Sequence, residues 1–86
     1  MQVNYDECEA ANVDPEKIKR IAQRLSKCGK ELNAMGLEVF GGSGIGTIRQ
    51  SANGDGSLIL AYLDGIFDGG DGAAIEGNDG LLRGEY

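Results

Sequence analysis

Histidine is absent from this chain of 86 residues, and aromatic side chains make up only 6% of it. The absence of histidine removes the usual general base near neutral pH and the commonest metal ligand. The remaining carboxylate pairs, such as Asp64 and Asp68, have a spacing that favours exposed loop acids over acid–base catalysis. We therefore expect a protein that is not an enzyme, with no catalytic residue, no metal site and no cofactor.

Long apolar runs and cysteines are also scarce. The longest apolar run, Leu58 to Leu63, is too short to cross a bilayer, and no basic residue followed by an apolar stretch marks a signal peptide at the N-terminus. These features predict a cytoplasmic protein that does not contact a membrane, in which Cys8 and Cys28 are free thiols. Cys28 is expected to be a small core residue on the apolar face of a helix.

Nucleotide-binding loops are missing as well. The stretch Gly41–Thr47 is glycine-rich, but it has no lysine before Thr47 to reach phosphates, as a Walker loop requires. A dinucleotide-binding loop would open a helix, whereas this stretch runs into β-like sequence. We interpret it as the loop of a hairpin.

Glycine and segregated charge are what the chain has in abundance. Of the 15 glycines, 14 lie from Gly36 onward, which predicts a second half rich in turns. The net charge of −6 conceals three blocks. Residues 1–16 hold five acids and no base, residues 17–30 hold six bases and no acid, and residues 31–86 hold nine acids and two arginines.

The surest predicted element is a helix from about Val13 to Met35. Asp14 suits its N-cap and Pro15 its first turn, while Gly36 suits a left-handed stop. Its apolar side chains fall on one arc and its bases largely on the other, as in an amphipathic helix.

The pattern of β-branched, aromatic and glycine residues over 37–67 predicts a β region of about three antiparallel strands. The segments 37–40 and 45–50 are typical of a hairpin, in which Gly46 suits a bulge. Asn53–Gly56 is typical of a turn into a third strand, Ser57 to Asp64. Both alternating sets of this third strand are apolar, so we expect it to be the best buried strand, with the helix on one face. Asp64-Gly65 is expected to turn the chain again.

The predicted fold is therefore a single α+β domain over residues 1–86. An acidic segment, 1–12, precedes the helix region, 13–36, which packs on the small antiparallel sheet of the β region, 37–67. A Gly- and Asp-rich C-terminal segment, 68–86, reads by composition as a tail, unless Ile75, Leu81 and Leu82 pin it to the domain.

Calcium binding is the alternative for this acidic segment. An EF-hand starting at Asp68 fails because its third and fifth positions are Gly70 and Gly72. Residues 77–81 resemble one turn of a calcium-binding β-roll, but such solenoids need several stacked turns. A solvated acidic segment is the preferred interpretation.

Two charged surfaces are the candidate binding sites. The acidic candidates are Asp55, Asp64, Asp68, Asp71, Glu76 and Asp79. The alternative is the basic face of the helix, with Lys19, Arg20, Arg24, Lys27 and Lys30. Acids on adaptable glycine-rich backbone favour a target protein with a basic surface, and net negative charge opposes direct binding of nucleic acid.

In kind, the chain resembles the small acidic inhibitors encoded by phages and prophages, including anti-CRISPR and antirestriction proteins. The resemblance rests on a short acidic domain without catalytic residues and on the run Asp64-Gly65-Ile66-Phe67-Asp68-Gly69-Gly70-Asp71; no family motif is matched. It implies stoichiometric blockade of a host defence nuclease or of its nucleic-acid-binding channel.

Three hypotheses of function follow from the sequence. The first is a non-catalytic inhibitor that binds a basic, nucleic-acid-binding surface of its target. The second is a nucleic-acid or regulatory binding module that uses the basic helix face. The third is a small structural domain that oligomerises through a strand edge at Leu37–Phe40.

Overall fold

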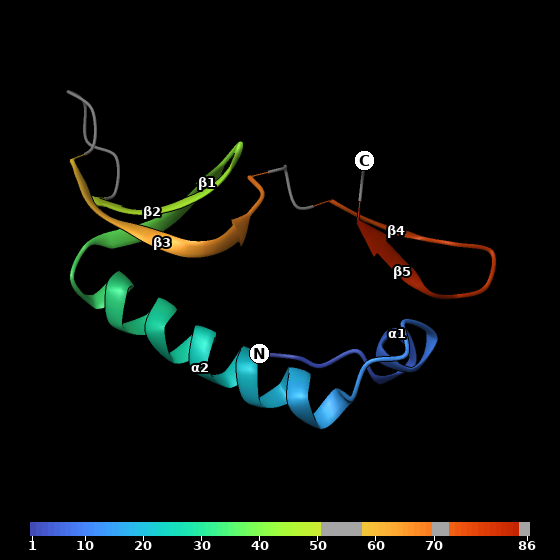
Figure 1. Ribbon diagram of the computed structural model, residues 1–86. Helices are drawn as coiled ribbons and strands as arrows, with labels where there is room; N and C mark the ends of the chain where they lie inside the picture. The colour runs from blue at the N-terminus through green and yellow to red at the C-terminus, as the bar shows by residue number, and fades with distance from the viewer. Residues whose placement is uncertain (51–57, 70–72, 85–86) are drawn as a thin grey trace. The chain divides into compact units, whose positions relative to one another are not determined.

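The computed structural model describes residues 1–50, 58–69 and 73–84. These residues form two α-helices, a three-stranded antiparallel sheet and a two-stranded antiparallel sheet, so the chain has the expected α+β fold (Figure 1). The chain divides into two compact units, Met1–Lys27 with Asp71–Tyr86, and Cys28–Gly70. The prediction of a single domain stays a prediction.

The long helix, α2, spans Pro15–Ala34, close to the predicted bounds. Asp14 caps it, because Asp14 Oδ1 accepts a hydrogen bond of 2.9 Å from the Glu16 backbone N–H. Gly36 ends it in the left-handed region at φ 72°, where glycine has no Cβ penalty. Both helix ends were thus predicted correctly.

None of the residues of α2 is buried, and its apolar side chains Ile18, Ile21 and Leu25 are exposed. Cys28 is exposed too, so its expected role as a core residue is wrong. An apolar arc on a helix predicts which side chains share a face, but not which surface covers that face. The packing of this arc on the sheet stays a prediction.

A short helix, α1, precedes α2 and spans Tyr5–Ala10. It was missed within the acidic segment 1–12, because six residues are too few to show a helical period. Its first turn carries Asp6 and Glu7, which suit the positive end of a helix dipole. Cys8 on this helix is the one buried apolar side chain among the described residues.

The three-stranded sheet consists of β1 (Leu37–Gly42), β2 (Gly44–Gln50) and β3 (Ile59–Phe67), in that order. Ser43 and Gly44 connect β1 to β2, both at positive φ (53° and 82°), while Gly42 pairs with Ile45. Positive φ at both central residues gives a turn whose twist matches that of the strands. The predicted hairpin is confirmed, and its loop is shorter than the glycine run suggested.

The best buried strand is β2 rather than the third strand, which corrects the prediction. Gly46 and Thr47 are the buried positions of the sheet, whereas most of β3 is exposed. The physical reason is the strand order: β2 pairs on both edges, and β3 pairs only with β2 in the described part of the chain. Apolar residues in both alternating sets show β propensity, but they do not fix a central position.

The turn expected at Asp64-Gly65 is also wrong, because β3 continues through both residues to Phe67. The pairing instead jumps from Gly46↔Leu63 to Gly44↔Phe67, so Asp64, Gly65 and Ile66 face a single residue of β2. This is a bulge, and Gly65 provides the positive φ (109°) within it. The pairing of β1 with β2 runs through Gly46 without a register shift, so the bulge expected there in the first hairpin is wrong; the irregularity lies in the pairing of β2 with β3.

The Gly- and Asp-rich segment forms a second hairpin of β4 (Ala74–Glu76) and β5 (Leu82–Gly84). Its turn is closed by two backbone bonds, from Gly80 N–H to the Gly77 carbonyl (3.0 Å) and from Gly77 N–H to the Leu81 carbonyl (2.9 Å). Gly80 has a φ of 79°. A type I turn followed by a left-handed glycine is a common hairpin connection, so composition alone misjudged this segment as a tail.

Candidate binding surfaces

The predicted acidic residues fall in different parts of the structure. Asp55 and Asp71 lie outside the described residues. Asp64 lies in the bulge of β3 and Asp68 just after that strand, both exposed. Glu76 and Asp79 are exposed on the second hairpin, which belongs to the other unit. The structure thus provides two local acidic groups, one in each unit.

Asp79 has a structural role in its hairpin turn. Its Oδ1 accepts hydrogen bonds from Arg83 Nη1 at 3.0 Å and from the Leu81 backbone N–H at 3.1 Å. Its Oδ2 accepts a hydrogen bond from Arg83 Nη2 at 2.8 Å. The hydrogen bonds from Arg83, with that from Leu81, hold the pKa of the Asp79 carboxyl well below its usual range. Residues 77–81, considered above as part of a calcium β-roll, therefore form a hairpin turn whose carboxylate binds an arginine.

The same hairpin contacts α1 through a hydrogen bond to a side chain. Glu7 Oε2 accepts the Leu82 N–H at 2.7 Å, and a hollow of about 310 Å³ lies between Glu7, Ala10 and Ala11 of the α1 region and Leu81–Arg83 of the hairpin. Of the apolar residues proposed to pin this segment, Ile75 and Leu82 are exposed and Leu81 is half-buried. Leu81 is thus the one of these three apolar residues that is partly covered, and the hydrogen bond to Glu7 ties the hairpin to α1.

The basic face of α2 is the more continuous of the two charged candidates. Four of its five predicted residues are exposed and Lys19 is half-buried. Arg20, Gln23, Arg24 and Lys27 together line a hollow of about 600 Å³. No described carboxylate pairs with any of the five bases. The structure thus brings three cations, one turn apart along the helix, to one open site.

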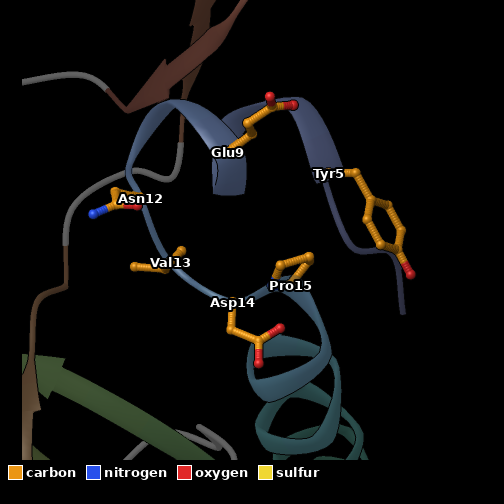
Figure 2. Close-up of a pocket in the computed structure, with 6 residues that line it drawn as sticks. All are labelled: Tyr5, Glu9, Asn12, Val13, Asp14 and Pro15. Atoms are coloured by element: carbon orange, nitrogen blue, oxygen red, sulfur yellow. The ribbon is translucent and has the colours of Figure 1, made fainter.

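A third site, between α1 and the start of α2, was not predicted from the sequence. Figure 2 shows the residues that line this open hollow of about 540 Å³, with the carboxylates of Glu9 and Asp14 pointing in opposite directions: Tyr5, Glu9, Asn12, Val13, Asp14 and Pro15. Tyr5 and Glu9 are four residues apart on α1 and so lie on the same side of that helix. Their spacing, followed by Asn12 and the Asp14 cap, is the only signal in the sequence that could have indicated this site.

The connection between the two helices has a well-defined geometry. Val13 N–H donates to the Cys8 carbonyl and Asn12 N–H to the Glu9 carbonyl, each at 3.0 Å. With Asn12 at φ 57°, this is the Schellman pattern that terminates a helix. Asp14 then caps α2 directly, so only the three residues from Ala11 to Val13 separate the last residue of α1 from the cap of α2. The walls of the hollow are fixed by backbone hydrogen bonds on both sides.

A small polar network supports the central strand of the sheet. Thr47 is 3% exposed and its Oγ1 lies 3.5 Å from the carbonyl oxygen of Phe40, its partner on β1. Arg49 Nε donates to Thr47 Oγ1 at 2.8 Å, and the Arg49 guanidinium lies 4.3 Å from the centroid of the Phe40 ring. Arg49 is therefore committed to the sheet and is not part of the basic face.

Cysteine, aspartate and glutamate do not gather in threes to form a possible ion site anywhere in residues 1–50, 58–69 or 73–84. Within those ranges no helix combines the length and apolar character that crossing a membrane requires. No protein-family model, curated protein or solved structure matches the chain.

Proposed function

We propose that this chain is a non-catalytic protein-interaction protein, an inhibitor that occupies a basic, nucleic-acid-binding surface of a target protein. The observation that carries the proposal is the segment from Asp64 to Asp68. Both carboxylates are exposed, and neither forms an ion pair with a described residue. Ile66, between them, is 91% exposed.

This arrangement has the features of a docking element. An apolar side chain that is almost fully exposed gains free energy when a partner buries it, on the order of 2 kcal/mol for an isoleucine. Flanking carboxylates attract a positively charged surface and orient the encounter. The bulge at Asp64–Ile66 gives this part of β3 its irregular backbone, and bulges commonly redirect side chains near functional sites.

The net charge of −6 also favours binding to a basic surface of a target protein. A negative protein is attracted over long range to a surface that evolved to hold phosphates, and it is repelled by nucleic acid itself. A small inhibitor of this kind requires no bond-making group, in keeping with a chain that has no histidine.

The test is affinity capture of partners from the native host, with the wild-type protein as bait and with the double variant Asp64→Asn, Asp68→Asn. We expect a partner that wild-type protein retains, that the double variant loses, and that added DNA or RNA displaces. Displacement is the decisive step, because inhibitor and nucleic acid would compete for one surface.

The matched control is Glu16→Gln, Glu31→Gln, which removes the same charge from exposed positions of α2. Equal loss of the partner in both double variants would show that only net charge matters. Retention of the partner in the presence of excess nucleic acid would contradict the proposed binding surface.

The basic face of α2 favours a second candidate function, direct binding of nucleic acid. Arg20, Arg24 and Lys27 line one open hollow, and phosphate contacts by such bases dominate non-specific affinity. In fluorescence anisotropy at low salt, Arg24→Gln should weaken binding and reduce the slope of log K against log salt by about 1. Lys17→Gln, which lies outside the hollow, should have little effect, and absence of binding by the wild-type protein at low salt would eliminate this function.

A further inference from the structure

From the apolar face of α2, we infer that this chain forms a symmetric dimer in which two copies of α2 pack antiparallel. The contact is a seam of side chains spaced alternately by three and four residues: Ile18, Ile21, Leu25, Cys28 and Leu32, with Met35 just beyond the helix. The inference goes beyond the proposed function and does not depend on the segment from Asp64 to Asp68.

This spacing is that of positions a and d in a heptad repeat. A stripe confined to these two positions is the narrow seam of helices that pack on each other in pairs. Because the seam drifts by about 20° per heptad around a straight helix, a helix as short as α2 can keep it against a partner without marked supercoiling. None of the residues of α2 is buried, and Leu25, at the middle of the seam, is 61% exposed.

The charged residues beside the seam identify the partner as a second copy. Arg24 and Glu31, both at position g, are exposed, and neither forms an ion pair with a described residue. In an antiparallel pair with Leu25 in one layer with Cys28 of the other copy, position g of each helix faces position g of the other. Arg24 and the Glu31 of the other copy are then about 3 Å apart along the helix axes. Two-fold symmetry forms this complementary pair twice, so the charges select self-association.

The small residues on the other side of the seam, Ala22 and Gly29 at position e, support the same arrangement. Gly29 lies in the interior of α2, where glycine is less favourable than alanine. Its own chain does not require a glycine there, because a Cβ at this position would meet nothing within 4 Å. In the antiparallel pair Gly29 faces Ala22 of the other copy, and two small residues allow the helix axes to approach closely. The dimer thus accounts for a glycine that a single copy does not explain.

A parallel pair of helices lacks these features. Position g would then face position e of the next heptad, so Arg24 would lie beside Gly29 of the other copy and Glu31 beside Gly36. Neither pairing is complementary. The helix dipoles would also be aligned side by side, whereas an antiparallel pair places opposite ends together.

The experiment exchanges the two charges in the whole chain and measures dimerisation by sedimentation equilibrium. Reductant is present throughout, because Cys28 is exposed and a disulfide would link copies by another route. The wild-type protein is expected to show a monomer–dimer equilibrium. Arg24→Glu places acids opposite each other and Glu31→Arg places arginines opposite each other. Each variant alone should dimerise about tenfold more weakly, since symmetry repeats the repulsion.

An equimolar mixture of the two variants is the decisive sample. One copy then has acids at both positions and the other has arginines at both, so a heterodimer regains two complementary pairs. At the same total concentration, the mixture should dimerise at least as strongly as the wild type. Recovery on mixing also shows that both variants are folded. A mixture that dimerises no better than the separate variants would overturn the antiparallel arrangement.

Lys30→Glu is the matched control, because it makes the same change of charge at an exposed position on the opposite face of α2. This variant should dimerise as the wild type does. Equal weakening by Lys30→Glu and Arg24→Glu would show that net charge alone governs association, which would overturn the paired register. A wild-type protein that stays monomeric at every concentration would overturn the dimer itself and leave the proposed function standing.

Discussion

At the scale of single residues, glycine positions decide how the sheet packs. A Cβ added at Gly46 would overlap the ring of Phe67, so this ring lies directly on the glycine backbone of the central strand. Gly69 lies similarly close to the Gly41 carbonyl. The ends of β1 and β3 therefore approach each other across β2, and glycine at these positions makes that approach possible.

Gly46→Ala is expected to destabilise the protein by about 1–3 kcal/mol, because the added methyl group must displace the Phe67 ring. The measurement is the free energy of unfolding in urea, together with hydrogen exchange of the β2 amides. Gly84→Ala is the control, since a Cβ there meets nothing within 4 Å. Equal stability of the two variants would show that the Phe67 ring is not fixed over Gly46.

The Asp79–Arg83 pair predicts a pH dependence of the second hairpin. Because the pKa of Asp79 is lowered in the folded state, its stabilising contribution is complete above the ordinary value of about 3.9 and is lost as the pH falls toward the folded value. NMR titration of the Asp79 carboxyl should show this low pKa, and Arg83→Gln should return it toward the ordinary range. An ordinary pKa in the wild-type protein would contradict the pair.

At the scale of elements, the sequence predicted the features that depend on residues adjacent in the chain, namely the ends of α2 and the first hairpin. Asp14, Pro15 and Gly36 marked both ends of α2, because capping depends on residues adjacent in the chain. The first hairpin followed from β-branched residues around a glycine run. The bulge of β3 was missed, since it depends on how Asp64–Ile66 align with Ile45 of another strand.

The candidate sites were predictable to a smaller extent. The basic face followed from helical spacing alone, because its members lie on one element. The hollow at Tyr5 and Glu9 depends on the angle between two helices, and this angle is fixed by backbone bonds at Asn12 and Val13 that no side-chain pattern reveals.

Gly29 and Gly36 allow a matched test of α2. At both positions a Cβ would meet nothing within 4 Å, but only Gly36 has a positive φ, of 72°. Gly29→Ala should stabilise the protein by about 1 kcal/mol, as expected for a helix interior. Gly36→Ala should destabilise it by about 1–2 kcal/mol, because alanine is strained in the left-handed region. Thermal unfolding followed by circular dichroism measures both, and changes of the same sign would contradict these assignments.

At the scale of the whole molecule, net charge and exposed apolar surface have opposite effects on self-association. Ile66 and Tyr62 are 91% and 74% exposed, and the net charge of −6 counters association through such groups. The strand edge at Leu37–Phe40, proposed from the sequence as an oligomerisation site, lies in β1, which is an outer strand of its sheet.

Solubility should therefore be lowest near pH 4.4, where the net charge vanishes. Turbidity measured across pH 3 to 8 (a range of about five units around the acidic pI) tests this expectation. Asp64→Asn, Asp68→Asn should move the minimum to higher pH. A solubility that does not change with pH would show that charge is not what keeps the exposed apolar residues apart.

The short connection between α1 and α2 places a limit on how this protein can change during evolution. Every residue from Ala11 to Asp14 either ends one helix or starts the next, so no position is left to absorb an insertion. One additional residue would separate the Schellman bonds from the cap and turn the two walls of the hollow away from each other. The length of this segment therefore carries as much structural information as the identity of its side chains.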